Sequence, residues 1–186
     1  DVSITYKNDK TIGGKEFDYQ IGGNISNIGN KISYTTETNS DFIPVNMRFG
    51  TFWKTQLDEY NEIGFGVDFN KLLVPSPVAV IDEDTGQIDR YQQPDISFLQ
   101  GIFESFNDAP DGFSEELKEI TWGFGSEYNF QDAFALRGGY FHESVDKGNR
   151  QYFTLGAGFR TNALNIDLSY LINSSDVNNP LENSLR

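Results

Sequence analysis

Several features are absent from this 186-residue chain, and each absence excludes a class of protein. There is no cysteine, so disulfide bonds and cysteine metal ligands are excluded, and the single histidine, His142, cannot form a site with two histidine ligands. No segment approaches the ~20 apolar residues of a membrane-spanning helix. Basic residues are scarce: 14 Lys and Arg stand against 28 Asp and Glu, for a net charge of −14. Such a surface repels phosphate, so nucleic acid is not expected as a partner.

Aromatic residues and glycine are abundant, and apolar and polar residues alternate over long stretches. The chain has 16 Phe, 9 Tyr and 18 Gly. Between residues 62 and 70, for example, Ile63, Phe65, Val67 and Phe69 alternate with small or polar residues. In a strand this period of two places every large apolar side chain on one face, whereas in a helix they would scatter. Eight segments show the pattern and are predicted to be strands: 2–6, 17–25, 45–53, 62–70, 120–129, 134–140, 153–160 and 164–170.

Two fold classes fit eight amphipathic strands, a soluble β-sandwich and a transmembrane β-barrel. The face opposite the apolar one carries charges in mid-strand, namely Arg48, Asp68, Glu127, Arg160 and Asp167. Such charges suit a hydrated lumen better than the surface of a sandwich, and Trp53, Tyr128 and Tyr170 near strand ends suit interfacial aromatic girdles. The pattern therefore favours an all-β, antiparallel transmembrane barrel, with short helices in one long external loop.

The lengths of the connections alternate as they do in outer-membrane barrels, which have short periplasmic turns and long external loops. The odd connections are the shorter ones and are predicted to be periplasmic: residues 7–16, 55–61, 131–133 and 161–163. The even connections are longer and are predicted to be external: residues 26–42, 71–119 and 143–151. The tail 173–186 would be external too.

The fourth connection is too long to lack structure of its own. Residues 78–81 and 88–91 flank Asp84-Thr85-Gly86 and predict a small hairpin. Asp95 is a candidate N-cap, after which Ile96, Leu99, Phe103 and Phe106 fall on one helical face, and Ser114 is a candidate cap for a second short helix through Lys118. Residues 71–118 hold ten acidic and three basic side chains.

The four apolar residues Ile96, Leu99, Phe103 and Phe106 are the candidate partner-binding residues of the chain. Exposed apolar patches usually mark binding surfaces. The alternative is that this stripe packs in cis over the barrel mouth as a lid.

No catalytic, cofactor or metal site is predicted. Asp84-Thr85-Gly86 has the sequence of the aspartic-protease triplet, but its acidic neighbours favour a tight turn over a dry catalytic cleft. The same acidic cluster lacks the spacing of a calcium loop. His142 and Glu143 are expected to be solvated at a strand end. No acid–base or nucleophile set is present, so the protein is not expected to be an enzyme.

Nine runs, in order along the chain, resemble the PorV family of the Bacteroidetes, also called LptO. They are residues 24–29 (Asn-Ile-Ser-Asn-Ile-Gly), 69–75 (Phe-Asn-Lys-Leu-Leu-Val-Pro), 101–106 (Gly-Ile-Phe-Glu-Ser-Phe), 108–110 (Asp-Ala-Pro), 115–120 (Glu-Glu-Leu-Lys-Glu-Ile), 135–137 (Ala-Leu-Arg), 147–150 (Lys-Gly-Asn-Arg), 152–154 (Tyr-Phe-Thr) and 179–186 (Asn-Pro-Leu-Glu-Asn-Ser-Leu-Arg). No single run is diagnostic, but their order is specific.

The resemblance implies a FadL-like barrel of about fourteen strands in the cell outer membrane. Residues 1–186 would then be the C-terminal part of one barrel domain, without its N-terminal strands and its final strand. The implied function lies in type IX secretion: binding the SprA translocon barrel, collecting secreted cargo by its C-terminal domain, and passing it to an attachment complex that contains the sortase PorU. Outer-membrane lipid would surround the barrel. The alternative function is a FadL-type channel for hydrophobic small molecules.

Overall fold

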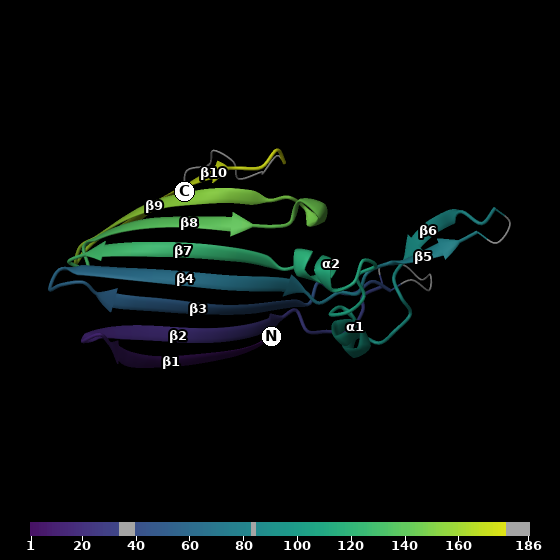
Figure 1. Ribbon diagram of the computed structural model, residues 1–186, viewed down its shortest axis with the longest axis horizontal. Helices are drawn as coiled ribbons and strands as arrows, with labels where there is room; N and C mark the ends of the chain where they lie inside the picture. Colours follow the sequence, from purple (N-terminus) through teal and green to yellow (C-terminus); the bar gives the residue numbers. More distant parts are fainter. Residues whose placement is uncertain (34–39, 83–84, 178–186) are drawn as a thin grey trace.

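The computed structural model describes residues 1–33, 40–82 and 85–177, and these residues form an eight-stranded antiparallel sheet with one elaborate connection (Figure 1). The strands of the sheet are β1 (Val2–Ile12), β2 (Lys15–Ser26), β3 (Asn46–Gln56), β4 (Asn61–Leu72), β7 (Thr121–Phe130), β8 (Phe134–His142), β9 (Gln151–Arg160) and β10 (Asn165–Asn173). Each strand pairs with its neighbour along the chain, in the order β1-β2-β3-β4-β7-β8-β9-β10. All eight strands predicted from the alternation are confirmed.

The short and long connections lie at opposite ends of the sheet, here called the turn end and the loop end (Figure 1). The predicted alternation of lengths is confirmed, with one correction. The first connection was expected over residues 7–16, but β1 continues to Ile12 and the turn consists of Gly13 and Gly14, whose φ angles are 60° and 82°. Two glycines allow this tight turn because positive φ costs them little. The polar residues on either side of the turn resemble a loop in the sequence, but they pair with each other as strands.

The two faces of the sheet differ in polarity, as the alternation predicts. One face is apolar and open, with Phe65 43% and Leu155 56% exposed. The other face lines an open hollow of about 950 Å³, whose lining includes Arg48, Asp68 and Glu127. Near the turn end, Arg160 and Asp167 line a second, more polar hollow. The predicted placement of these charges opposite the apolar face is therefore confirmed.

Ion pairs link strands across the hollowed face. Arg137 of β8 pairs with Glu127 of β7 and, at 2.5 Å, with Asp167 of β10. Lys54 of β3 lies 2.9 Å from Glu62 of β4. Glu127, Arg137 and Asp167 are thus paired on the hollowed face, while the large apolar groups stay on the opposite face.

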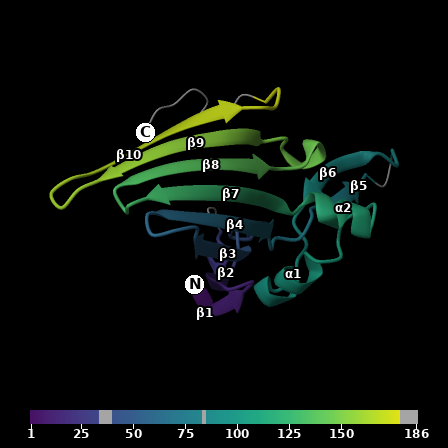
Figure 2. The same ribbon diagram turned by 60° about the vertical axis from the view of Figure 1, so that its left-hand side comes forward.

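The sheet is curved but not closed, as the turned view shows (Figure 2). Among the described residues β1 pairs with β2 alone and β10 with β9 alone, so each has a free edge. The fold is all-β and barrel-like in its polarity and strand order.

The fourth connection folds into two parts that extend beyond the loop end of the sheet (Figure 1). It begins with the hairpin β5 (Val78–Ile81) and β6 (Ile88–Gln92), which confirms the predicted hairpin. Asp84 of the triplet lies outside the described residues. Gly86 N donates to Asp82 O over 2.9 Å, which is the bond of a tight turn.

Two short helices follow, α1 (Phe98–Glu104) and α2 (Phe113–Lys118), and both predicted caps are wrong. Ser97, not Asp95, caps α1, and its side chain accepts from Gln100 N. Ile96 therefore precedes the helix and Phe106 follows it. Gly112, not Ser114, is the N-cap of α2. The Asp111 amide donates to Glu115 of the helix, a contact that starts α2 before Ser114. A 3-10 helix, η1 (Val145–Lys147), lies between β8 and β9. Neither α-helix of the described part is long and apolar enough to cross a membrane.

Candidate partner-binding site

The tightest packing among the described residues lies where the fourth connection meets the sheet. Leu73, directly after β4, is 2% exposed, and Val45, directly before β3, is 3% exposed. Leu73 N donates to Val45 O over 2.7 Å and joins the two segments. Ala109, Ser105 and Gly101 of the connection are also buried. The connection is thus packed against the sheet, and its shape is fixed by that contact.

Helix α1 is held by a close approach to the second connection. A Cβ atom on Gly101 would lie 2.6 Å from Cε1 of Phe42 and 3.2 Å from Cδ of Pro75, so any larger residue would force Phe42 to move. Lys31 reinforces the contact, because its Nζ lies 4.4 Å from the centre of the Phe42 ring and donates to Pro94 O over 3.0 Å. Gly101 and Ser105, four residues apart, therefore define the packed face of α1.

The predicted apolar stripe lies on the opposite, exposed side. Leu99 is 54%, Phe103 74% and Phe106 45% exposed, while Ile96 is half-buried. Leu99 and Phe103 share one face of α1, and Phe106 follows two residues after the helix ends. Phe106 lies closest to the sheet, because it shares a hollow with Phe49 of β3 and Phe69 of β4. Three of the four candidate residues thus have exposed apolar side chains.

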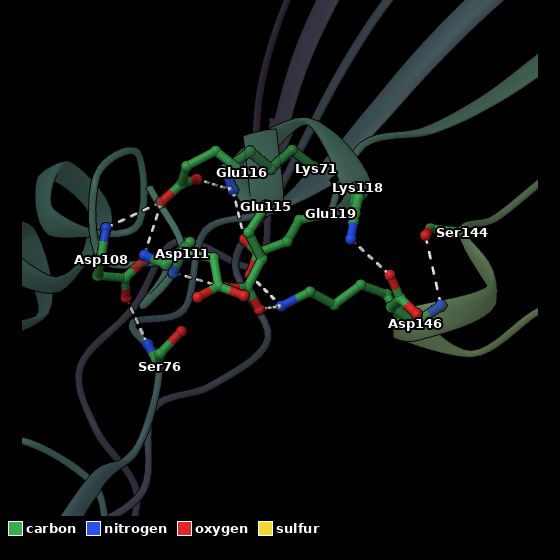
Figure 3. Close-up of polar contacts among 12 residues, drawn as sticks. Lys71, Ser76, Asp108, Asp111, Glu115, Glu116, Lys118, Glu119, Ser144 and Asp146 are labelled. Carbon is green, nitrogen blue, oxygen red and sulfur yellow. Dashed lines mark hydrogen bonds and ion pairs between the residues drawn. The ribbon is translucent and has the colours of Figure 1, made fainter. Parts of the chain in front are cut away.

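Helix α2 is fixed to the sheet by a buried lysine. Lys71, near the end of β4, is 4% exposed, and its Nζ lies 3.0 Å from Glu116 and 2.6 Å from Glu119 (Figure 3). Glu116 uses its other oxygen to accept from the backbone amides of Asp108 and Ala109, over 2.8 and 2.9 Å. One carboxylate therefore joins the sheet, α2 and the segment between the two helices.

A second set of ion pairs joins α2 to η1. Lys118 lies 2.6 Å from Asp146, and Lys147 lies 2.9 Å from Glu115 and 3.0 Å from Glu119 (Figure 3). The hydrogen bond from Lys147 lowers the pKa of Glu115, and that from Lys118 lowers the pKa of Asp146. Burial raises the pKa of Glu116, but the hydrogen bonds from Ala109 and Lys71 outweigh it, so its pKa is lowered. All three carboxylates are therefore charged at neutral pH.

Sequence reasoning missed this ion-pair network. The run from Glu115 to Glu119 has the composition of a solvated helix, and no spacing rule relates Lys71 to a residue 45 positions away. The excess of acidic residues in the connection was the one available signal, since buried carboxylates require a cation or hydrogen-bond donors.

The network also determines how a cluster of carboxylates is neutralised. Oxygens of Asp108, Glu116 and Glu119 lie within 4.8 Å of one another, close enough to hold a metal ion. The Lys71 ammonium already contacts Glu116 and Glu119, and Asp108 accepts from Ser76 N. The chain thus supplies the positive charge of this cluster itself.

The expectation that Glu143 is solvated is wrong. Glu143 is 6% exposed and pairs with Arg150 over 2.7 Å at the loop end. This hydrogen bond lowers the pKa of Glu143. His142 stacks on Trp122, with ring centres 5.1 Å apart. Both contacts fix the connection between β8 and β9.

The fold and this site together define a class of protein: an antiparallel sheet with an apolar outer face and a polar inner face, carrying an anchored, partly apolar loop at one end. The family model described as "Type IX secretion system protein PorV" matches residues 1–79. The match confirms the PorV resemblance over this part of the chain and supports a type IX secretion system protein. It spans β1 to β4, including the runs 24–29 and 69–75, whereas α1 and α2 lie outside it. No curated protein matches the chain.

Proposed function

We propose that the protein is an outer-membrane component of type IX secretion that works by binding rather than by chemistry. It binds an SprA-like translocon barrel and the C-terminal domains of secreted cargo, and passes cargo to a PorU-like sortase and attachment complex. The surface that contacts these partners is Leu99, Phe103 and Phe106, with Ile96 at its border.

The observation that carries this proposal is an exposed apolar stripe on a firmly anchored support. Gly101 against Phe42, and Lys71 between Glu116 and Glu119, hold the fourth connection in place. Ordering a long connection costs conformational entropy, which these contacts offset in advance. A stripe held in this way binds a partner without a further ordering cost.

The sheet itself belongs in the outer membrane under this proposal, as part of a larger closed barrel. Its apolar face suits lipid and its charged face suits a lumen. The free edges of β1 and β10 would leave unpaired backbone groups in lipid, so they require further strands.

The proposal is tested with Phe103→Asp combined with Phe106→Asp in cells that secrete by this route. The double variant is expected to reach the outer membrane at normal levels and to lose co-purification of the translocon barrel or of cargo. Val145→Asp is the matched control, because Val145 is 68% exposed in another connection at the loop end. Unchanged co-purification and secretion would exclude the stripe, and failure of the double variant to assemble would favour a lid.

One observation favours the alternative of a channel for hydrophobic small molecules. The hollow on the inner face is large, and its lining includes the aromatic residues Phe52, Phe141 and Tyr152. A transport assay in reconstituted vesicles distinguishes the two functions, because a channel admits small apolar solutes and a binding protein does not. Solute entry abolished by Phe52→Arg would support the channel.

A further inference from the structure

A small apolar groove lies beside the stripe, at the junction of α2 and the outer face of the sheet. Its volume is about 160 Å³. The sheet contributes Met47 and Phe49 of β3 and Phe69 of β4. The fourth connection contributes Phe106, Phe113, Leu117 and Ile120. The groove therefore joins the end of the stripe to the apolar face of the sheet.

The groove is open, and its size fits a single large apolar side chain. Phe113 is 76%, Leu117 52%, Phe49 51% and Phe69 45% exposed. A cavity of about 150 Å³ lined by apolar groups accommodates a benzene ring. The buried pair of Lys71 and Glu116 also lines the groove and holds α2 against β4, so the groove is preformed.

The charge around the groove distinguishes between two kinds of occupant, a lipid and a protein segment. The adjoining network contains six carboxylates and three lysines, a net charge of −3. The carboxylates are Asp108, Asp111, Glu115, Glu116, Glu119 and Asp146, and the lysines are Lys71, Lys118 and Lys147. Anionic lipid headgroups are repelled by this charge, whereas Lys and Arg of a protein are attracted.

We propose that this groove binds one aromatic or aliphatic side chain of a protein partner, presented by a segment with basic residues on both sides. The inference rests on the proposed function, because it gives the chemistry of the partner that the fourth connection recognises. The apolar side chain supplies affinity by filling the groove, and the basic residues supply the rate of association and the orientation.

The test uses the purified protein in nanodiscs of neutral lipid and a fluorescent peptide with one phenylalanine between two pairs of lysines. Anisotropy is expected to show binding that weakens as salt is raised. Phe113→Ser and Leu117→Ser should each weaken it about tenfold, as a central contact residue does. Both side chains are exposed, so the variants are expected to fold.

Two matched variants and two matched peptides make the result specific. Phe103→Ser, on the stripe but outside the groove, and Val145→Ser, on η1, should leave peptide binding unchanged. A peptide with serine in place of phenylalanine, or glutamate in place of lysine, should bind at least tenfold more weakly.

Three outcomes would overturn the inference. They are equal binding of the serine peptide, binding unaffected by both Phe113→Ser and Leu117→Ser, and a photo-crosslinker at Leu117 that attaches only to lipid in the membrane. The peptide assay needs no secretion machinery, so failure of this inference can be distinguished from failure of the proposed function. Failure of the proposed function would appear as normal secretion in the Phe103→Asp and Phe106→Asp double variant.

Discussion

At the scale of single residues, the structure of the loop end depends on two residues whose roles another residue type could not fill. Lys71 supplies the positive charge that two carboxylates require, and Gly101 supplies the space that Phe42 occupies. Buried charges are costly unless they are paired. Any residue other than glycine at position 101 would bring a Cβ atom to 2.6 Å from Phe42. Both residues act on the position of the fourth connection.

Lys71→Met is predicted to release α2 from the sheet. The change leaves Glu116 buried without its cation, at a cost of about 3–5 kcal/mol. Limited proteolysis should then cut the fourth connection faster while the sheet still assembles. Lys71→Met combined with Glu116→Gln should recover part of the protection, since the uncompensated charge is gone. Equal cutting of the Lys71→Met variant and the parent would contradict the role given to Lys71.

Gly101→Val is predicted to displace α1. The new Cβ would lie 2.6 Å from Phe42, a distance that forces the helix or the second connection to move. Proteolysis between β6 and α2 is the measurement, with Gln100→Val on the exposed side of α1 as the control. Phe42→Ala should restore the protection of the Gly101→Val protein, because it removes the clash. If it does not, the clash is not the cause.

At the scale of elements, each strand separates two environments and α2 joins two connections. The apolar outer face follows from the period of two, and ion pairs on the inner face join Lys54 to Glu62 and Arg137 to Asp167. Helix α2 is fixed at one side by Lys71 and at the other by η1.

Reversing the polarity of the outer face is predicted to impair assembly. Phe65→Arg and Leu155→Arg place a charge on the apolar face, at up to about 2–4 kcal/mol near the middle of a bilayer. Arg160→Gln, on the polar face, should be milder, because Arg160 is exposed and donates to Asn165 only over 3.3 Å. Heat-modifiable migration in gels reports assembly. A larger defect in Arg160→Gln would show that the outer and inner faces of the strands are assigned the wrong way round.

The contact between α2 and η1 is predicted to withstand mild acid. The pKa values of Glu115 and Asp146 are lowered in the folded protein, so their contribution to stability is present above the ordinary pKa values of 4.5 and 3.8. It is lost as the pH falls through the still lower folded values. Hydrogen exchange in α2, corrected for intrinsic rates, should be constant from about pH 8 to pH 5. Loosening near pH 6 would contradict this.

At the scale of the whole molecule, all long connections of the sheet lie at one end and all short turns at the other (Figure 1). In outer-membrane barrels the long loops face the exterior and the short turns the periplasm. The anchored connection with its stripe and groove would therefore face the exterior.

The orientation is tested by cysteine labelling, since the chain has no native cysteine. Ser175→Cys, after β10 at the loop end, should react with an impermeant thiol reagent on whole cells. Asp132→Cys, in the turn between β7 and β8, should react only after the outer membrane is opened. The reverse pattern would show that the sheet has the opposite orientation in the membrane. The parent chain, which has no cysteine, controls for background labelling.

The sequence by itself determined the strands and the direction in which their side chains face. A period of two is a local property, so eight strands, the hairpin at residues 78–92 and the polarity of each face could be predicted from neighbouring residues. The first turn was missed because paired polar residues resemble a loop. The caps of α1 and α2 were missed because a cap depends on where the backbone bends.

Only the tertiary structure decided how the fourth connection sits and which of its apolar groups are free. Lys71 meets Glu116, Gly101 meets Phe42, and Phe69 shares a groove with Leu117, all across 45 or more residues of chain. Such contacts depend on the folded path of the whole connection. Helical periodicity placed Leu99 and Phe103 on one face, but it could not tell whether that face packs or remains exposed. That depends on which side of α1 packs against Phe42. The side with Gly101 packs there, so the side with Leu99 and Phe103 remains exposed.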